Sequence, residues 1–242
     1  SERTITTVPC LGVVFDFDGV IANTELLHLQ AYQDVLGQTP MILSKEVYES
    51  TYLGYDDIGV FTRLAKDQHI VLSPDEISAL IVLKGKRYTQ LVESKNVIFP
   101  EARGCIERLA GTCELGIASG ALHQEIETIL LASSLRSYFT TIVAADDVEH
   151  SKPEPDTYRL AVELLCTARG RAPSPNGFVA IEDSLWGIQS AHAAGLPCIA
   201  VTTTYSATTL TVANHIVPSL DDIDVKTLET LVENSQTSSN KP

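Results

Sequence analysis

The stretch Val13-Val14-Phe15-Asp16-Phe17-Asp18-Gly19-Val20 is an apolar run that ends in two carboxylates separated by one residue. Side chains alternate along an extended strand, so residues i and i+2 point to the same side. The pattern predicts that Asp16 and Asp18 lie close together where a buried strand ends, with Gly19 allowing a sharp turn. Two like charges so close are costly unless a cation or a proton lies between them. The pair therefore indicates either a divalent-metal site or a nucleophile beside an acid.

Two other structures begin with the same short pattern. Asp and Gly are common turn formers, so residues 16–19 alone are also typical of an ordinary polar turn. Calcium-binding loops open in the same way, but they need further oxygen ligands at alternate positions and a closing glutamate. Here the chain continues Val20-Ile21-Ala22, which excludes a calcium loop.

The composition is that of a globular protein with a strongly negative charge. The 242 residues, 44% of them hydrophobic, suffice for one large domain or for a core domain with a smaller insertion. The formal net charge of −14, from 31 acidic and 17 basic residues, disfavours nucleic acids and anionic membranes as partners. A small anionic substrate remains compatible, because a metal and a few lysines reverse the potential inside a pocket.

The cysteines and the apolar runs bear on the cell compartment. An odd number of cysteines without C-x-x-C spacing fits neither a disulfide framework nor a zinc site, so we expect reduced, buried thiols at Cys10, Cys105, Cys113, Cys166 and Cys198. No apolar run reaches the roughly 18 residues of a membrane span, and no signal-peptide pattern opens the sequence. We predict a cytoplasmic location and no membrane partner.

Hydrophobic periodicity predicts helices, without a convincing strand, from Thr24 to about residue 92. Thr24 is placed to cap the first helix, and Ser73-Pro74 followed by two acids marks the start of another. At the other end of the chain, the Ser/Thr/Asn-rich sequence after Val232 is typical of a loose tail.

From about residue 99, short β-type runs alternate with helical stretches. We expect strands at 12–16, 114–118, 141–144, 178–181, 198–201 and 216–217, and helices at 101–110, 124–133, 157–168 and 185–194. This alternation predicts a parallel sheet covered on both faces. The expected fold class is α/β: a Rossmann-like parallel-sheet core of residues 1–23 and 98–242, with an all-helical domain of residues 24–97 inserted after the first strand.

Polar residues follow four of the expected strands, where ligands bind in sheets of this kind. They are Asp16 and Asp18, Ser119 and Gly120, Lys152, and Glu182 and Asp183. Each alone also fits a helix cap, a turn or a solvated surface charge. Together, at one edge of a sheet, acids with one lysine and one serine are what a magnesium-dependent phosphoryl-transfer site requires.

These motifs resemble those of the haloacid dehalogenase superfamily of hydrolases, in the subfamily whose helical cap is inserted after the first strand. The resemblance extends over essentially the whole chain. Within this subfamily, the chain is similar to β-phosphoglucomutase-like and phosphoglycolate phosphatase-like proteins. The residues that carry it are Asp16-Phe17-Asp18-Gly19-Val20, Thr24-Glu25, His28, Ser119, Lys152-Pro153, Glu182-Asp183, Gly187, Ala194-Gly195 and Pro197.

The resemblance implies a role for each motif. Asp16 would attack phosphorus and form an aspartyl phosphate, and Asp18 would act as general acid and then as general base. The phosphoryl oxygens would be held by Ser119, by Lys152 and by backbone amides near Gly120.

The resemblance also implies the cofactor Mg²⁺. Its ligands would be the Asp16 carboxylate, the Asp18 backbone carbonyl and Asp183, with Glu182 either a direct ligand or one water removed. Within the superfamily, dehalogenases need neither a second aspartate nor magnesium, and phosphonate hydrolases have a small residue in its place. The presence of Asp18 therefore favours phosphoester chemistry.

Substrate choice, by the same resemblance, resides in the helical insertion. In sugar-phosphate mutases the loop corresponding to residues 53–57 carries a basic residue that binds a second phosphate. Here the loop is aromatic and acidic, with Tyr55 and Asp56, which disfavours a mutase. Lys84 either matches a cap lysine of mutases or lies on a solvated helix face, and His28 occurs in mutases and phosphatases alike.

We therefore expect a Mg²⁺-dependent phosphatase that acts as a monomer on a small phosphorylated metabolite, either a sugar phosphate or phosphoglycolate. A hexose-phosphate mutase is the second candidate. The third is a non-catalytic sensor of a phosphorylated metabolite, which would have little reason to retain both Asp16 and Asp18.

Overall fold

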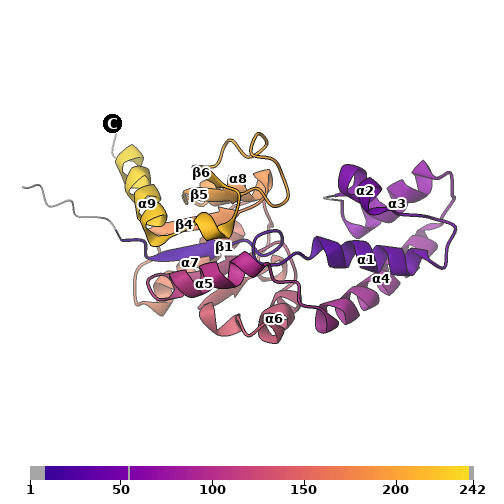
Figure 1. The fold of residues 1–242 in the computed structure, drawn as a ribbon, viewed down its shortest axis with the longest axis horizontal. Coiled ribbons are helices and arrows are strands. Elements are labelled where there is room, and N and C mark those ends of the chain that lie inside the picture. The colour runs from indigo at the N-terminus through magenta and orange to yellow at the C-terminus, as the bar shows by residue number, and fades with distance from the viewer. Residues whose placement is uncertain (1–8, 54, 240–242) are drawn as a thin grey trace, which may run out of the picture. The chain divides into compact units, whose positions relative to one another are not determined.

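The chain forms two compact units, unit 1 from Ser1–Asn23 and Val97–Pro242, and unit 2 from Thr24–Asn96. The structure, a computed structural model, describes residues 9–53 and 55–239 (Figure 1). Gly54, which belongs to the expected substrate loop, lies outside the described residues.

Unit 1 is built on a six-stranded parallel sheet in the order β3-β2-β1-β4-β5-β6. The strands are β1 (Gly12–Phe15), β2 (Glu114–Ala118), β3 (Thr141–Val143), β4 (Phe178–Glu182), β5 (Cys198–Val201) and β6 (His215–Val217). Each lies within one residue of its expected bounds, which confirms the α/β fold class. Because the strand order reverses at β1, the carboxyl end of β1 is where a ligand site is expected in such a sheet.

Helices cover both faces of this sheet. They are α5 (Pro100–Ala110), α6 (His123–Ala132), α7 (Asp156–Ala168), α8 (Leu185–Ala193) and α9 (Val225–Ser239), joined by 3₁₀ turns at Arg136–Tyr138, Ala145–Asp147 and Leu220–Asp222. Every residue of β1 is buried, although successive side chains point to opposite faces. On one face α7 and α8 pack against the strands and each other, with Val14, Ala180 and Ile188 in their core.

The C-terminal helix corrects one expectation. The prediction of a loose tail after Val232 is wrong, because α9 continues to Ser239. Leu228 and Val232 are buried, so an apolar stripe packed on the core stabilises a helix whose own composition is polar.

Over the described residues of unit 2, the regular secondary structure is entirely helical. It contains α1 (Glu25–Leu36), α2 (Lys45–Val47), a π-helical turn at Tyr48–Tyr52, α3 (Asp57–Asp67) and α4 (Pro74–Ser94) around a core that includes Tyr32, Phe61 and Leu64. The start expected at Ser73 is confirmed, because Ser73 and Glu76 form a capping box there. Thr24 precedes α1 but its side chain makes no cap hydrogen bond, since its backbone is helical (φ −78°, ψ −20°) rather than extended.

The insertion leaves unit 1 and returns to it at adjacent points. The Asn23 amide donates to the Val97 carbonyl (2.8 Å), and the Phe99 amide donates to the Ile21 carbonyl (2.9 Å). The chain therefore departs for unit 2 directly after the turn that carries Asp16 and Asp18.

The burial of the cysteines and the expected lack of a membrane span can be compared with the fold. All five cysteines are buried. Among the described helices, none combines the length and the apolar character needed to cross a membrane.

Candidate active site

Four segments of unit 1 bring predicted site residues together at the carboxyl edge of the sheet. Asp16 follows β1, Ser119 follows β2, Glu182 and Asp183 stand at the end of β4, and Lys152 lies in the loop between β3 and α7. Carboxylate oxygens of Asp16, Glu182 and Asp183 lie within 4.8 Å of one another. Three acids from two neighbouring strands thus share one buried space.

Lys152 joins two of these carboxylates. Its Nζ lies 2.8 Å from Oδ1 of Asp16 and 2.5 Å from Oε1 of Glu182. The lysine side chain is only 11% exposed, and burial alone would lower its pKa. The charges of Asp16 and Glu182 outweigh that effect and hold the Lys152 pKa above its ordinary value, so the amine remains protonated.

Protein donors occupy both oxygens of Glu182. The Tyr158 hydroxyl donates to Oε1 (2.7 Å), the oxygen that Lys152 also contacts. On the other side, Oε2 accepts from the Asp183 amide (3.2 Å) and the Ser184 hydroxyl (3.4 Å). A Cβ at position 187 would lie 1.9 Å from the Glu182 carboxyl group, so only glycine fits there.

The acidic cluster holds more negative charge than Lys152 balances. Burial raises the pKa values of Asp16, Glu182 and Asp183 above their ordinary range. Repulsion from neighbouring carboxylates raises all three further, and Lys152 opposes the shift at each. Ionising all three carboxyl groups beside one ammonium is therefore unfavourable without a further cation. A cation bound at this site would stabilise the ionised carboxylates.

Asp18 is half-buried two residues beyond Asp16, and the turn after it is shaped around Asp183. Gly19 adopts a left-handed backbone (φ 79°), and a Cβ there would lie 2.0 Å from Oδ2 of Asp183. That oxygen accepts a hydrogen bond from the Thr204 hydroxyl (2.5 Å), and the Thr203 hydroxyl donates to the Gly19 carbonyl. The two threonines were not singled out from the sequence. Their position just after β5, at the same edge of the sheet, is the sequence feature that would have indicated them as site residues.

Ser119 presents a buried hydroxyl at the end of β2. Its Oγ accepts a hydrogen bond from the Ala121 amide (3.0 Å), which leaves the hydroxyl proton to donate to another acceptor. Gly120 is exposed, and no atom lies within 4 Å of the place its Cβ would take. No side chain at Gly120 would therefore keep a bound anion away from the backbone of this loop.

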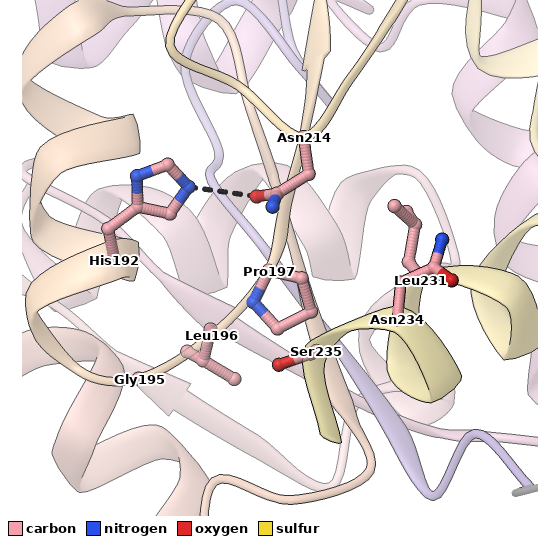
Figure 2. Close-up of a pocket in the computed structure, with 8 residues that line it drawn as sticks. All are labelled: His192, Gly195, Leu196, Pro197, Asn214, Leu231, Asn234 and Ser235. Carbon is pink, nitrogen blue, oxygen red and sulfur yellow. Dashed lines mark hydrogen bonds between the residues drawn. The ribbon is translucent and has the colours of Figure 1, made fainter. Parts of the chain in front are cut away.

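A cavity of about 440 Å³ lies elsewhere, at the amino end of β5 (Figure 2). It is lined by His192, Gly195, Leu196, Pro197, Asn214, Leu231, Asn234 and Ser235. Nε2 of His192 and Oδ1 of Asn214 meet across it at 2.8 Å. None of the predicted site residues lines this cavity, so it is separate from the carboxylate cluster.

In unit 2, Lys84 is buried rather than on a solvated helix face. Its Nζ lies 2.7 Å from Oδ1 of Asp57 and 2.9 Å from Nδ1 of His28, and it sits over the rings of Tyr32 and Tyr88. Burial, reinforced by the Lys84 charge, lowers the pKa of His28 to about 3. Since an ammonium can only donate, Nδ1 of neutral His28 accepts and its ring proton lies on Nε2.

The two remaining predicted residues of unit 2 differ in their contacts. Tyr55 is exposed. The Asp56 carboxylate caps α3, because it accepts a hydrogen bond from the Gly59 amide at 2.7 Å. A change at Asp56 therefore affects the helix as well as any ligand.

Replacing Asp56 by alanine is expected to lower the free energy of unfolding by about 1 kcal/mol, because the cap of α3 is lost. Asp56→Ser retains an oxygen that caps the helix, so it serves as the matched variant. If Asp56 selects substrate, both variants will change the ratio of kcat/KM between two phosphoesters, while only the alanine variant loses stability in urea. If the ratio of kcat/KM is unchanged in both variants, Asp56 only caps α3 and does not select substrate.

Comparisons with known proteins identify relatives of the whole α/β fold. A family model described as haloacid dehalogenase-like hydrolase matches residues 13–201. Fructose-1-phosphate phosphatase YqaB of Escherichia coli is 31% identical over 193 residues, which cover 78% of this chain and 95% of that protein. Protein CbbY of Cereibacter sphaeroides is 31% identical over 198 residues, which cover 78% of this chain and 82% of CbbY.

Solved structures show the same fold. CbbY from Rhodobacter sphaeroides in complex with phosphate superposes with a TM-score of 0.71 at 25% identity, over 89% of this chain and 96% of CbbY. A mutant of CbbY has also been solved with xylulose-(1,5)bisphosphate. A predicted phosphoglycolate phosphatase from Haemophilus somnus has a TM-score of 0.76 at 19% identity, over 90% of this chain and 97% of that one, and shows the fold alone.

Proposed function

Because the chain belongs to the haloacid dehalogenase-like hydrolase family, we propose that it is a Mg²⁺-dependent phosphatase that hydrolyses a small sugar phosphate. The observation that carries this proposal is the buried pairing of Asp16 with Lys152, with Asp18 two residues further along the same turn. The choice of a sugar phosphate is supported by the relatives, one named for fructose 1-phosphate and another bound to a sugar bisphosphate.

The proposed reaction proceeds in two transfers of the phosphoryl group. A carboxylate oxygen of Asp16 attacks phosphorus, the bond from phosphorus to the ester oxygen breaks, and protonated Asp18 gives its proton to the leaving alkoxide. Water then attacks the aspartyl phosphate, Asp18 takes up the proton of that water, and inorganic phosphate leaves with Asp16 restored. An oxygen leaving group needs this proton, which explains a second aspartate at position 18.

Two side chains are proposed to hold the transferring group. Lys152, which is cationic and lies 2.8 Å from Asp16, would stabilise negative charge on the phosphoryl oxygens and reduce its repulsion from the nucleophile. The Ser119 hydroxyl, whose proton is available, would donate to one of the same oxygens, with the exposed backbone of Gly120 beside it.

The residues present fit a magnesium ion. All the donors are oxygens, and the carboxylates of the cluster share one buried space. Burial raises the pKa values of these carboxyl groups, and repulsion between them, which Lys152 only partly offsets, raises the pKa values further. Such oxygen-rich sites are those that Mg²⁺ prefers. Asp16, Asp183 and the Asp18 backbone carbonyl would hold the ion, which when bound supplies positive charge against the phosphoryl group.

Glu182 is proposed to act on Lys152 rather than as a direct ligand of the metal. Both of its oxygens already accept hydrogen bonds from the protein, and Oε1 is 2.5 Å from the lysine ammonium. Removing these donors to free an oxygen for a metal would leave buried polar groups without partners, which is costly.

Unit 2 is proposed to act as the cap that selects the substrate. Support comes from its connection to unit 1 directly after the turn with Asp16 and Asp18. Within it, Tyr55 and Asp56 offer exposed groups for specificity, whereas Lys84 and His28 would act through the polar cluster that they form with Asp57.

Phosphate release from a panel of sugar phosphates, phosphoglycolate and nucleotides tests the proposal. We expect release that requires Mg²⁺, stops on addition of EDTA and favours one sugar phosphate. Activity that persists in EDTA would contradict the metal, and preference for phosphoglycolate would contradict the substrate class. If no ester is hydrolysed, conversion of β-glucose 1-phosphate to glucose 6-phosphate in the presence of a bisphosphate would indicate a mutase, and failure of both would indicate a sensor.

A further inference from the structure

Tyr158, which was not singled out from the sequence, is fully buried beside the site. Its hydroxyl donates to Oε1 of Glu182 (2.7 Å), and Nζ of Lys152 lies 2.5 Å from the same oxygen. The lysine ammonium also sits over the Tyr158 ring, 4.9 Å from its centroid. Tyr158 thus contacts both Lys152 and the carboxylate that holds it.

We propose that Tyr158 is a positioning residue that keeps Lys152 directed at Asp16 and the phosphoryl group, an inference that rests on the proposed function. Lys152 lies between two anions, Asp16 and Glu182. The Tyr158 hydrogen bond takes up part of the accepting capacity of Glu182 Oε1. The carboxylate therefore attracts Lys152 less strongly than it would with Lys152 as its only donor at that oxygen.

The positions of the other groups around Glu182 make this balance possible. Oε2 is fixed by the Asp183 amide and the Ser184 hydroxyl, so the carboxylate cannot rotate freely to offer Lys152 a second oxygen. A lysine ammonium has three N–H donors. Two of them point at Asp16 and Glu182, and the third remains for a phosphoryl oxygen, with the Tyr158 ring limiting where the ammonium can move.

Tyr158→Phe removes the hydroxyl and keeps the ring, so it isolates the hydrogen bond to Glu182. We expect kcat to fall about tenfold, which corresponds to roughly 1.4 kcal/mol, while KM changes less than threefold. Inhibition by vanadate, which imitates the transferring phosphoryl group, should weaken by a similar factor. The inhibition constant does not depend on how much enzyme is active, so a purely structural effect of the substitution would leave it unchanged.

Tyr52→Phe is the matched control, because Tyr52 is a buried tyrosine whose hydroxyl donates to the Asp67 carboxylate (2.9 Å) in unit 2. It should leave kcat and vanadate inhibition unchanged. Glu182→Gln adds a second test. If Tyr158 acts by weakening the pull of Glu182 on Lys152, Tyr158→Phe should have little further effect in a Glu182→Gln background, and strictly additive losses would overturn the inference.

Wild-type turnover separates this inference from the proposed function. An active wild type with an unaltered Tyr158→Phe variant overturns the role of Tyr158 and leaves the phosphatase intact. If no ester is hydrolysed by the wild type, the phosphatase fails, and calorimetric binding of vanadate with Mg²⁺ decides the role of Tyr158. About tenfold weaker binding to Tyr158→Phe would support the positioning role there too, and equal binding or no binding to the wild type would overturn it.

Discussion

Replacement of Asp16 by asparagine is expected to lower turnover more than about 100-fold, a loss of at least ~2.7 kcal/mol in transition-state stabilisation. The amide has nearly the same shape as the carboxylate but is a poor nucleophile, so no aspartyl phosphate forms. The measurement is kcat for the preferred sugar phosphate with Mg²⁺ present. Residual turnover above about 1% of wild type would remove Asp16 as the nucleophile.

The same substitution should not unfold the protein. Asp16 shares a buried space with Glu182 and Asp183, and its charge raises the pKa of both. Removing one of three negative charges relieves this repulsion, so we expect the melting temperature in EDTA to be equal to or above that of wild type. Asp221→Asn, a change at an exposed aspartate, is the control for preparation and handling and should retain full turnover.

Replacement of Lys152 by methionine should have the largest effect on stability. It leaves the buried carboxylates of Asp16 and Glu182 without their cation, and breaking a buried pair in this way costs about 3–5 kcal/mol. Urea unfolding in EDTA measures the loss. Turnover should fall as well, because the positive charge opposite the phosphoryl group is lost.

Two further variants make the Lys152 prediction specific. Lys45→Met breaks an exposed pair with Glu49 (3.7 Å), for which a loss of no more than about 0.5 kcal/mol is expected. Adding Asp16→Asn to Lys152→Met should restore part of the lost stability, since one of the unpaired charges is removed. A loss below about 1 kcal/mol for Lys152→Met, or no recovery in the double variant, would contradict a buried charge network.

The strands of the sheet were predictable because both faces are covered. The sequence of a strand that is buried on two sides is a short continuous apolar run. The strands β2 and β5 have the same bounds as the runs from which they were predicted. The edge that carries the candidate site followed from the same property, since polar residues directly after such runs, such as Asp16 and Ser119, lie where parallel strands end.

The remaining features depend on contacts between distant segments. Lys84 resembles a surface lysine in the sequence, and its burial arises from Asp57 on α3 and His28 on α1. Tyr158 looks like an ordinary core residue of α7, because its hydrogen bond to Glu182 joins two separate segments. The ordered end of α9 depends likewise on the surface against which Val232 packs. Periodicity within one helix does not encode these partners.

The position of the insertion also determines the order in which the chain can fold during synthesis. Strand β1 is made first, yet its neighbours are β2 and β4, with Gly12 opposite Glu114 and Phe178. Unit 2 is a single continuous stretch, Thr24–Asn96, all of which is made before β2, so it can fold as soon as it leaves the ribosome. Until β2 follows, the apolar strand Gly12–Phe15 has two unpaired edges, which makes the nascent chain most prone to aggregation at that stage.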